Sequence, residues 1–413
     1  AQLNALGWTG FSTTATFSAI TTAGMFLGAL VGGIIGDKTG RRNAFILYEA
    51  IHIASMVVGA FSPNMDFLIA CRFVMGVGLG ALLVTLFAGF TEYMPGRNRG
   101  TWSSRVSFIG NWSYPLCSLI AMGLTPLISA EWNWRVQLLI PAILSLIATA
   151  LAWRYFPESP RWLESRGRYQ EAEKVMRSIE EGVIRQTGKP LPPVVIADDG
   201  KAPQAVPYSA LLTGVLLKRV ILGSCVLIAM NVVQYTLINW LPTIFMTQGI
   251  NLKDSIVLNT MSMFGAPFGI FIAMLVMDKI PRKTMGVGLL ILIAVLGYIY
   301  SLQTSMLLIT LIGFFLITFV YMYVCYASAV YVPEIWPTEA KLRGSGLANA
   351  VGRISGIAAP YAVAVLLSSY GVTGVFILLG AVSIIVAIAI ATIGIETKGV
   401  SVESLSIDAV VNK

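Results

Sequence analysis

The sequence predicts an all-α membrane protein that consists of two related helix bundles. Apolar residues make up 56% of the chain and charged residues only 12%, about half the share found in soluble domains. Charged motifs of the first half recur in the second half at a nearly constant offset. Cations are concentrated in alternate loops between apolar segments, as is typical of proteins with many membrane spans.

Eleven segments are long and apolar enough to cross a bilayer, which takes about 20 residues of α-helix. They are residues 12–36, 43–61, 67–91, 104–128, 136–153, 219–245, 256–277, 284–301, 305–330, 346–368 and 374–394. We expect five of them, in residues 1–153, to form an N-terminal bundle and six, in residues 219–394, to form a C-terminal bundle. Residues 154–218 are predicted to be a cytoplasmic linker and residues 395–413 a cytoplasmic tail.

The orientation of the spans is predicted from the loops. Most Lys and Arg residues lie in the linker, in the tail or in the loops near Asp37, Asp278 and Glu334. The opposite loops contain essentially Arg135 and Lys253. By the positive-inside rule, the cation-rich loops and the C-terminus are cytoplasmic.

A charged turn at residues 33–42, with the sequence GIIGDKTGRR, separates the first two spans. Its counterpart at residues 277–283 reads MDKIPRK and places Asp278 at an offset of 241 residues from Asp37. Charged side chains are costly in hydrocarbon, so both turns mark an aqueous boundary.

Two further pairs repeat in the same order. Glu334 follows Glu92 at an offset of 242 residues, and Glu396 follows Glu158 at an offset of 238. Three ordered pairs at nearly one offset indicate an internal duplication. Duplicated membrane halves with a binding site between them are typical of transporters.

The duplication predicts one more helix than the sequence contains. The C-terminal bundle begins 59 residues before Asp278, and the same distance before Asp37 leads to position −22, ahead of Ala1. We therefore expect eleven visible spans of an inferred twelve, with the first helix of the N-terminal bundle missing.

Residues 33–42 match the loop motif G-x-x-x-D-[RK]-x-G-R-[RK] of the major facilitator superfamily at every specified position. Residues 157–162, with the sequence PESPRW, and the segments that follow Glu92 and Glu334 resemble its sugar porter and metabolite branch. The resemblance covers the whole chain and implies the major facilitator fold, with two pseudo-symmetric helix bundles in a bacterial inner membrane. It also implies that the missing helix lines the substrate cavity and, in proton-coupled members, often carries an acidic residue.

The repeated motifs predict a cytoplasmic gate. We expect their charged side chains to form salt bridges when the protein is closed on the inner side and to separate when it opens. The candidate gate residues are Asp37, Arg41, Arg42, Glu92, Arg99, Glu158, Arg161, Asp278, Glu334 and Arg343.

Three ionisable residues within the spans are candidates for ion coupling, because such residues are costly in lipid. Arg72 matches the fourth-helix arginine of the superfamily, which can pair with an acid on the missing helix. Glu49 and His52, the only histidine, share a helix face at i and i+3. The alternatives are structural pairing for Arg72 and membership of the cytoplasmic salt-bridge network for Glu49.

Polar and aromatic side chains within the spans are candidates for a substrate cavity, since polar groups in hydrocarbon usually face water or a ligand. They are Trp112, Tyr114, Asn231, Gln234, Tyr235, Asn239, Trp240, Asn259, Tyr323, Tyr326 and Arg353. For Trp112 and Tyr114 the alternative is helix packing.

Two features of the spans indicate the substrate class. Arg353 resembles a cavity-facing arginine of the organic-ion and niacin transporter branch. If the substrate is a carboxylate, Arg353 is expected to bind it with two hydrogen bonds, and a structural pairing is the alternative. Met230 and Asn231 occupy the place of the paired glutamines of sugar porters, which argues against a simple hexose.

The motifs also exclude several classes of protein. The chain has no G-x-x-x-x-G-K-[ST] phosphate loop, which argues against ATP as the energy source. A single histidine and the lack of paired acids in a cavity argue against an enzyme. The four cysteines lie in apolar spans and predict neither disulfides nor a metal site, so no cofactor is expected.

We therefore expect a secondary active transporter of a small polar metabolite, such as a sugar, polyol, sugar acid or other organic acid. It would work by alternating access and be coupled to protons. The expected partners are the substrate, protons and the bilayer, with no nucleic acid and a monomeric chain. The alternatives are an uncoupled facilitator and a transporter-like nutrient sensor.

Overall fold

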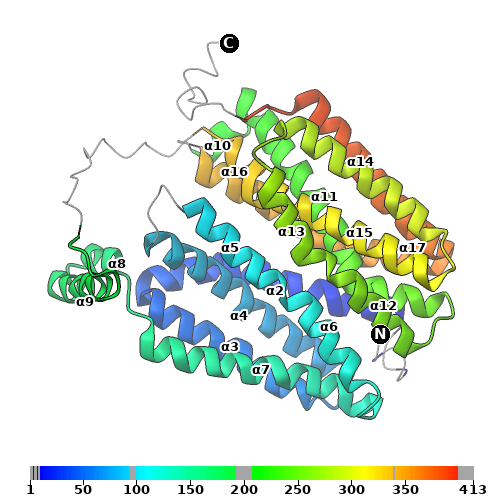
Figure 1. Ribbon diagram of the computed structural model, residues 1–413, viewed down its shortest axis with the longest axis horizontal. Helices are drawn as coiled ribbons and strands as arrows, with labels where there is room; N and C mark the ends of the chain where they lie inside the picture. Colours follow the sequence, from blue (N-terminus) through cyan, green and yellow to red (C-terminus); the bar gives the residue numbers. More distant parts are fainter. Residues whose placement is uncertain are drawn as a thin grey trace. The chain divides into compact units, whose positions relative to one another are not determined.

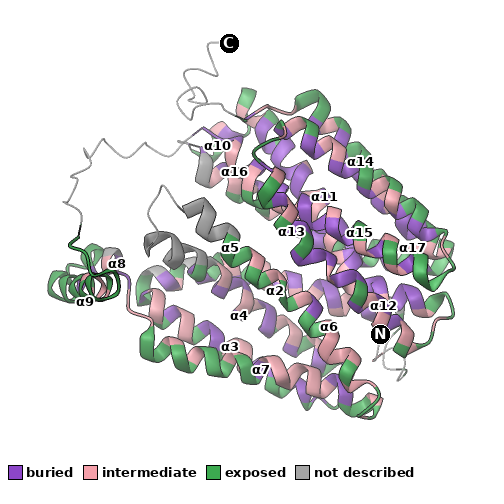
Figure 2. Ribbon diagram, viewed as in Figure 1, coloured by how far each residue is buried: buried purple, intermediate pink, exposed green. Residues whose placement is uncertain are grey.

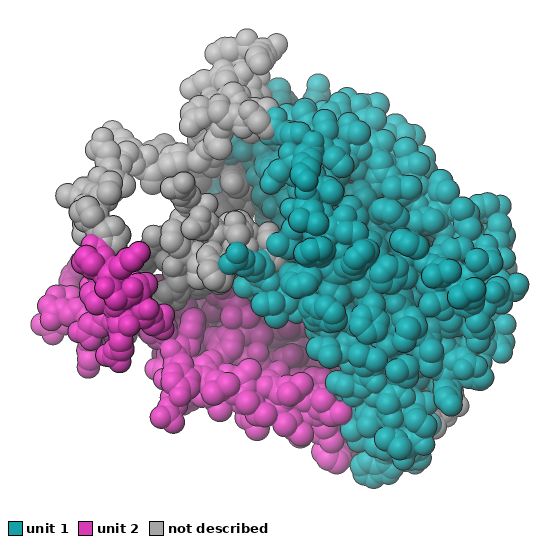
Figure 3. Space-filling model, viewed as in Figure 1, with its two compact units in different colours: residues 1–22, 103–137, 203–413 teal, residues 23–102, 138–202 magenta. Residues whose placement is uncertain are grey.

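The computed structural model describes residues 3, 7, 10–93, 99–191, 207–337 and 340–398, and every regular element in these ranges is a helix (Figure 1). The chain forms two compact units (Figure 3). Unit 1 comprises residues 1–22, 103–137 and 203–413, and unit 2 comprises residues 23–102 and 138–202. The predicted boundaries of the two bundles stay a prediction.

Unit 2 holds the later part of α2 (Phe11–Thr39) and of α7 (Ala130–Tyr155). Its other helices are α3 (Arg41–Ala60), α4 (Met65–Tyr93), α8 (Pro160–Ser165) and α9 (Tyr169–Thr187). Ser159 begins α8, because its side chain accepts a hydrogen bond from the Trp162 N–H and Pro160 occupies the first turn.

Unit 1 holds most of α5 (Arg99–Asn111) and the early parts of α2 and α7. Its other helices are α6 (Ser113–Leu124), α10 (Tyr208–Leu211), α11 (Gly214–Thr247), α12 (Leu252–Met263), α13 (Gly265–Val276), α14 (Arg282–Ser301), α15 (Met306–Cys325), η2 (Tyr326–Tyr331), α16 (Val332–Glu334) and α17 (Lys341–Ile393). Buried residues are dense along α11, which packs mainly against α17 (Figure 2).

Nine helical stretches of the described residues are long and apolar enough to cross a membrane. Two features account for the difference from the eleven predicted spans. Helix α17 runs through two of them, with a non-helical backbone at Gly371, where φ is 65°. The predicted span 104–128 is divided into α5 and α6 at Trp112, where Pro115 removes one backbone bond of the helix.

Helix α7 has the exposed apolar surface that is expected of a helix in contact with lipid. Ile143, Leu144, Leu146 and Ile147 are exposed, although water would disfavour such a continuous apolar face. The chain is therefore an all-α membrane protein in which the apolar side chains of this helix face the lipid.

The internal duplication is visible in helix packing. In unit 2, a Cβ added to Gly24 or Gly28 would lie 2.3 Å from Phe73 O or 2.0 Å from Val77 O, so α2 and α4 cross with their backbones in contact. Such crossings need small residues.

The same crossing occurs in unit 1 between α13 and α15. A Cβ added to Gly265 would lie 2.5 Å from Phe314 O, and one added to Gly269 would lie 2.3 Å from Thr318 O. All four positions follow their counterparts by 241 residues, so the repeated sequence specifies a repeated contact.

Candidate functional site

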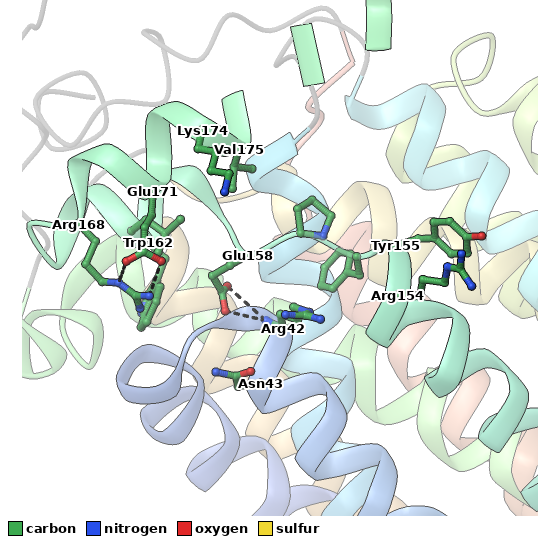
Figure 4. Close-up of a pocket in the computed structure, with 13 residues that line it drawn as sticks. Arg42, Asn43, Arg154, Tyr155, Glu158, Trp162, Arg168, Glu171, Lys174 and Val175 are labelled. Atoms are coloured by element: carbon green, nitrogen blue, oxygen red, sulfur yellow. Dashed lines mark hydrogen bonds and ion pairs between the residues drawn. The ribbon is translucent and has the colours of Figure 1, made fainter. Parts of the chain in front are cut away.

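A glutamate caps the helix that follows the first charged turn. Glu158 Oε1 accepts hydrogen bonds from the backbone N–H groups of Arg41 at 2.7 Å and Arg42 at 3.3 Å, at the start of α3 (Figure 4). Gly40 makes this possible, since its φ is 94° and an added Cβ would lie 2.2 Å from Glu158 Oε2. A negative group at a helix N-terminus is favourable because the backbone N–H groups there lack partners.

The repeat of this cap is Glu396, at the start of α14 in unit 1. Its two oxygens accept hydrogen bonds from the N–H groups of Arg282 at 2.8 Å and Lys283 at 3.1 Å. Burial alone would raise the pKa of Glu396, but these donors, the Lys398 N–H and the charge of Arg282 lower that pKa below its usual range. The carboxylate therefore stays ionised and holds the segment after α17 against α14.

Arg282 is the centre of a charge cluster in unit 1. Its guanidinium donates to Glu334 Oε2 at 3.0 Å and Oε1 at 3.1 Å, and it pairs with Asp278 at 3.2 Å. Thr397 donates to Glu334 Oε2 at 2.6 Å. The Arg282 side chain is 7% exposed and that of Glu334 34%, so the bonds between these two are shielded from water more than those of a surface salt bridge, whereas the Asp278 side chain is 92% exposed.

The other gate candidates differ in their surroundings. Arg41 donates to Gly36 O at 3.0 Å, Arg42 donates to Trp153 O, and the Arg343 guanidinium lies 5.2 Å from the centroid of the Tyr208 ring. The side chains of Asp37, Glu92, Arg99 and Arg161 lie outside the described residues. The opening and closing of a gate by these residues stays a prediction.

Several cavity candidates meet in unit 1. The rings of Tyr114 on α6 and Tyr321 on α15 lie edge to face with centroids 5.3 Å apart. Gln234 on α11 lies near Tyr321, whose buried hydroxyl has no hydrogen-bond partner among the described residues. The next residue, Tyr235, interacts electrostatically with both Tyr114 and Arg353. Side chains from four helices, α6, α11, α15 and α17, thus form one polar and aromatic cluster, which we call the tyrosine–arginine cluster.

Two glycines of α17 allow its backbone to lie close to side chains of α11. A Cβ on Gly356 would lie 3.2 Å from the Tyr235 ring, and one on Gly352 would lie 3.0 Å from Asn231 Nδ2. Asn231 is buried and donates to Leu227 O at 2.8 Å, so its amide is partly engaged within its own helix. Arg353 lies between these glycines in sequence and is half-buried.

Asn259 joins α12 to α6. Its Nδ2 donates to Ser118 Oγ at 3.2 Å, and Thr260 next to it donates to Ser118 O at 3.2 Å. The Asn259 Oδ1 atom is buried and has no hydrogen-bond donor among the described residues.

The remaining cavity candidates have other surroundings. Trp112 is exposed and lies edge-on to Phe264, whereas Trp240 is fully buried and Asn239 is half-buried. Tyr323 donates to Val226 O at 3.0 Å, and Tyr326 stacks on Tyr331. The two tyrosines are packed as core residues of unit 1, and their role in a cavity stays a prediction.

The coupling candidates lie in unit 2. His52 Nδ1 is 3.8 Å from Glu49 Oε2, as the i, i+3 spacing predicts, and both side chains are largely buried. The Arg72 Nη1 atom lies 3.6 Å from Met75 Sδ. Among the described residues, no three His, Cys, Asp or Glu side chains are grouped so that they could hold a metal ion.

Sequence reasoning did not name Arg282, Glu396, Ser118 or Tyr321 as site residues. The repeat contained the signal for the first two, because Arg282 follows Arg41 by 241 residues and Glu396 follows Glu158 by 238. Tyr321 gave only its place in a stripe of tyrosines with Tyr323 and Tyr326, and Ser118 gave no signal, since the roles of both depend on which helices lie side by side.

Known proteins resemble the whole chain. Residues 9–409 match the family model described as "Sugar (and other) transporter". The chain is 99% identical to YdjK of Escherichia coli (strain K12), a protein named for metabolite transport, over 100% of this chain and 90% of that protein. It is 44% identical to the inner membrane metabolite transport protein YdjE of the same strain, over 98% of this chain and 89% of that protein.

Among solved structures, the inward-open conformation of the xylose transporter XylE from E. coli has a TM-score of 0.75 at 17% identity. The match covers 98% of this chain and 92% of that chain, which supports the fold. With the family match over nearly its full length, the chain belongs to the sugar (and other) transporter family.

Proposed function

We propose that this transporter moves a small organic acid, such as a sugar acid or an aromatic acid, across the bacterial inner membrane. It does so by alternating access, in which two helix bundles, residues 1–153 and 219–394, move against each other. Transport is coupled to protons, the chain works as a monomer, and its C-terminus is cytoplasmic. Inner-membrane placement is supported by the name of YdjE and by the many apolar helices.

The substrate class rests on Arg353. Among the described residues, no carboxylate lies within ion-pair distance of its half-buried guanidinium. A guanidinium keeps its charge in proteins, and an unpaired charge within a membrane helix is costly. A carboxylate on the substrate would remove that cost with two parallel hydrogen bonds.

The other members of the tyrosine–arginine cluster suit the rest of such a molecule. Tyr114, Tyr235 and Tyr321 offer ring faces and hydroxyl groups, and Gln234 offers an amide donor and acceptor. An aromatic or polyhydroxylated acid uses both kinds of contact.

Proton coupling is supported by Glu49 and His52, which face each other on α3, and by Arg72 on α4. Proton-coupled transporters carry protons on Asp, Glu and His side chains within the membrane, and Glu49 and His52 are side chains of these types. XylE, which has the same fold, is described as a proton:xylose symporter.

The test is uptake into proteoliposomes. A thermal-shift screen of sugars, polyols, sugar acids and aromatic acids selects ligands, and uptake of the best is measured with and without an inward proton gradient. We expect acids to stabilise the protein and the gradient to drive their accumulation. Uptake that reaches only equilibrium under both conditions indicates an uncoupled facilitator, and stabilisation by neutral sugars alone contradicts the substrate class.

A further inference from the structure

A pocket of about 790 Å³ lies in unit 2 where membrane helix α7 leads into the short helices α8 and α9 (Figure 4). Arg42 lies at its base, at the start of α3, and Trp162 and Arg168 lie on one side of it (Figure 4). Arg154 and Tyr155, the end of α7, lie on the opposite side, and Lys174 reaches toward it from α9 (Figure 4).

The pocket is lined by more cations than carboxylates. Its two carboxylates are engaged, since Glu158 caps α3 and Glu171 accepts two hydrogen bonds from Arg168, at 2.8 and 2.6 Å. Across the described ranges, no carboxylate lies within ion-pair distance of Arg154 or Lys174. The buried Nε of Arg42 has no hydrogen-bond acceptor in the same ranges. The pocket therefore presents an excess of donors and positive charge.

An apolar groove adjoins this basic pocket. It has a volume of about 420 Å³ and is lined by Phe45, Leu86, Leu151, Ala152, Tyr155 and Phe156. Tyr155 and Phe156 line both cavities, so one molecule can occupy the two together.

Aromatic residues indicate at which level of the bilayer the two cavities lie. Trp153 and Tyr155, at the end of α7, are 62% and 70% exposed. Exposed Trp and Tyr at the end of a span mark the boundary between hydrocarbon and head groups. The groove then lies at the level of acyl chains, and the basic pocket at the level of phosphates.

We propose that this pair of cavities binds an anionic phospholipid, with its phosphate beside Arg42, Arg154 and Lys174 and one acyl chain in the groove. The phosphate supplies the acceptors that Arg154 and Lys174 lack among the described residues, and the chain covers the exposed carbon of Leu86 and Leu151. A bound lipid would hold α8 and α9 against the end of α7. A free phosphate satisfies the charges but leaves the groove empty.

The test measures lipid binding to the purified full chain in a neutral detergent by native mass spectrometry. The probes are dioleoyl phosphatidylglycerol, dioleoyl phosphatidylcholine and soluble glycerol phosphate. We expect a preference of at least tenfold for phosphatidylglycerol over phosphatidylcholine. The double variant Arg154→Gln/Lys174→Gln should weaken phosphatidylglycerol binding about 25-fold, because each cation near an anionic lipid contributes about fivefold.

The matched control is Arg185→Gln/Lys189→Gln, which removes two exposed cations near the end of α9, outside the pocket. It should change the affinity less than twofold. Lys174→Gln alone serves if the double variant does not fold, since Lys174 is exposed and its loss leaves no gap in the core. Equal binding of both lipids by the unaltered protein, an unchanged affinity in the pocket variants, or equal binding of glycerol phosphate would overturn the proposal.

Discussion

At the scale of single residues, Arg353 and Glu396 have opposite environments. Arg353 is a cation without a carboxylate partner among the described residues, whereas Glu396 is an anion surrounded by donors. A polar group that lacks a partner is suited to a ligand, and one that is fully bonded is suited to holding the structure. The two residues therefore lead to different predictions.

Arg353→Lys keeps the charge but loses the planar pair of donors. We expect the affinity for a carboxylate substrate to fall at least tenfold, while the melting temperature without substrate stays within about 2 °C. Ligand-dependent thermal shifts measure both quantities, with Arg185→Lys on exposed α9 as the control. Unchanged affinity, or a loss of folding, would exclude direct recognition by Arg353.

Glu396→Gln should lower stability at neutral pH but not in acid. The pKa of Glu396 is lowered in the folded protein, so its contribution is present above the unfolded pKa, about 4.3, and is lost as the pH falls through the folded pKa. Thermal unfolding of both proteins between pH 7 and 3 checks this. The gap between their melting temperatures should close toward pH 3, and a constant gap would contradict the role of the charge.

At the scale of elements, each unit uses one glutamate to begin a membrane helix. Glu158 caps α3 and Glu396 caps α14, and both carboxylates come from segments that follow a later helix. Each cap thus ties a distant segment to a helix N-terminus. In unit 2 the tie depends on Gly40, which combines a φ of 94° with the close approach of Glu158.

Gly40→Ala should break this tie. A side chain at this backbone conformation costs about 1–3 kcal/mol, and its Cβ would displace the carboxylate as well. We expect a lower melting temperature and easier proteolysis at residues 156–159, next to the displaced Glu158. Gly110→Ala, in an open position of α5, should be neutral by both measurements. Equal effects of the two substitutions would disprove the proposed cap geometry.

At the scale of the whole molecule, these ties are candidates for the contacts that favour the state closed on the inner side. Arg282 bonds to Glu334 and, through its backbone, to Glu396, so one residue joins three segments of unit 1. Bonds that exist in one conformation alone bias the equilibrium between conformations without touching the substrate.

Arg282→Gln should shift the protein toward the inward-open state. Loss of a charge-assisted bond costs about 1.5–3 kcal/mol, which corresponds to a population change of about 10- to 150-fold. Spin-label distances across the inner side measure the shift, and transport should slow while substrate affinity persists. Lys279→Gln, which removes a nearby cation, is the control. An unaltered distance distribution in Arg282→Gln would refute the latch.

The sequence alone determined the fold class, and it predicted the spans and the duplication. These properties depend only on the order of residues along the chain, since a span needs a run of apolar residues and a duplication needs matching motifs at one offset. Hydropathy determined span boundaries less well, because a helix such as α17 can continue through two spans with a kink at Gly371. The twelfth span stays a prediction.

Only the tertiary structure decided which side chains meet. Three features depend on residues far apart in sequence. They are the pairing of Tyr114 with Tyr321, the lack of a carboxylate near Arg353 among the described residues, and the basic pocket beside an apolar groove. Such contacts depend on the rotation and crossing of helices, which small residues such as Gly28, Gly269 and Gly356 permit. Hydropathy specifies that a helix crosses the membrane, but packing specifies which of its faces receives a partner.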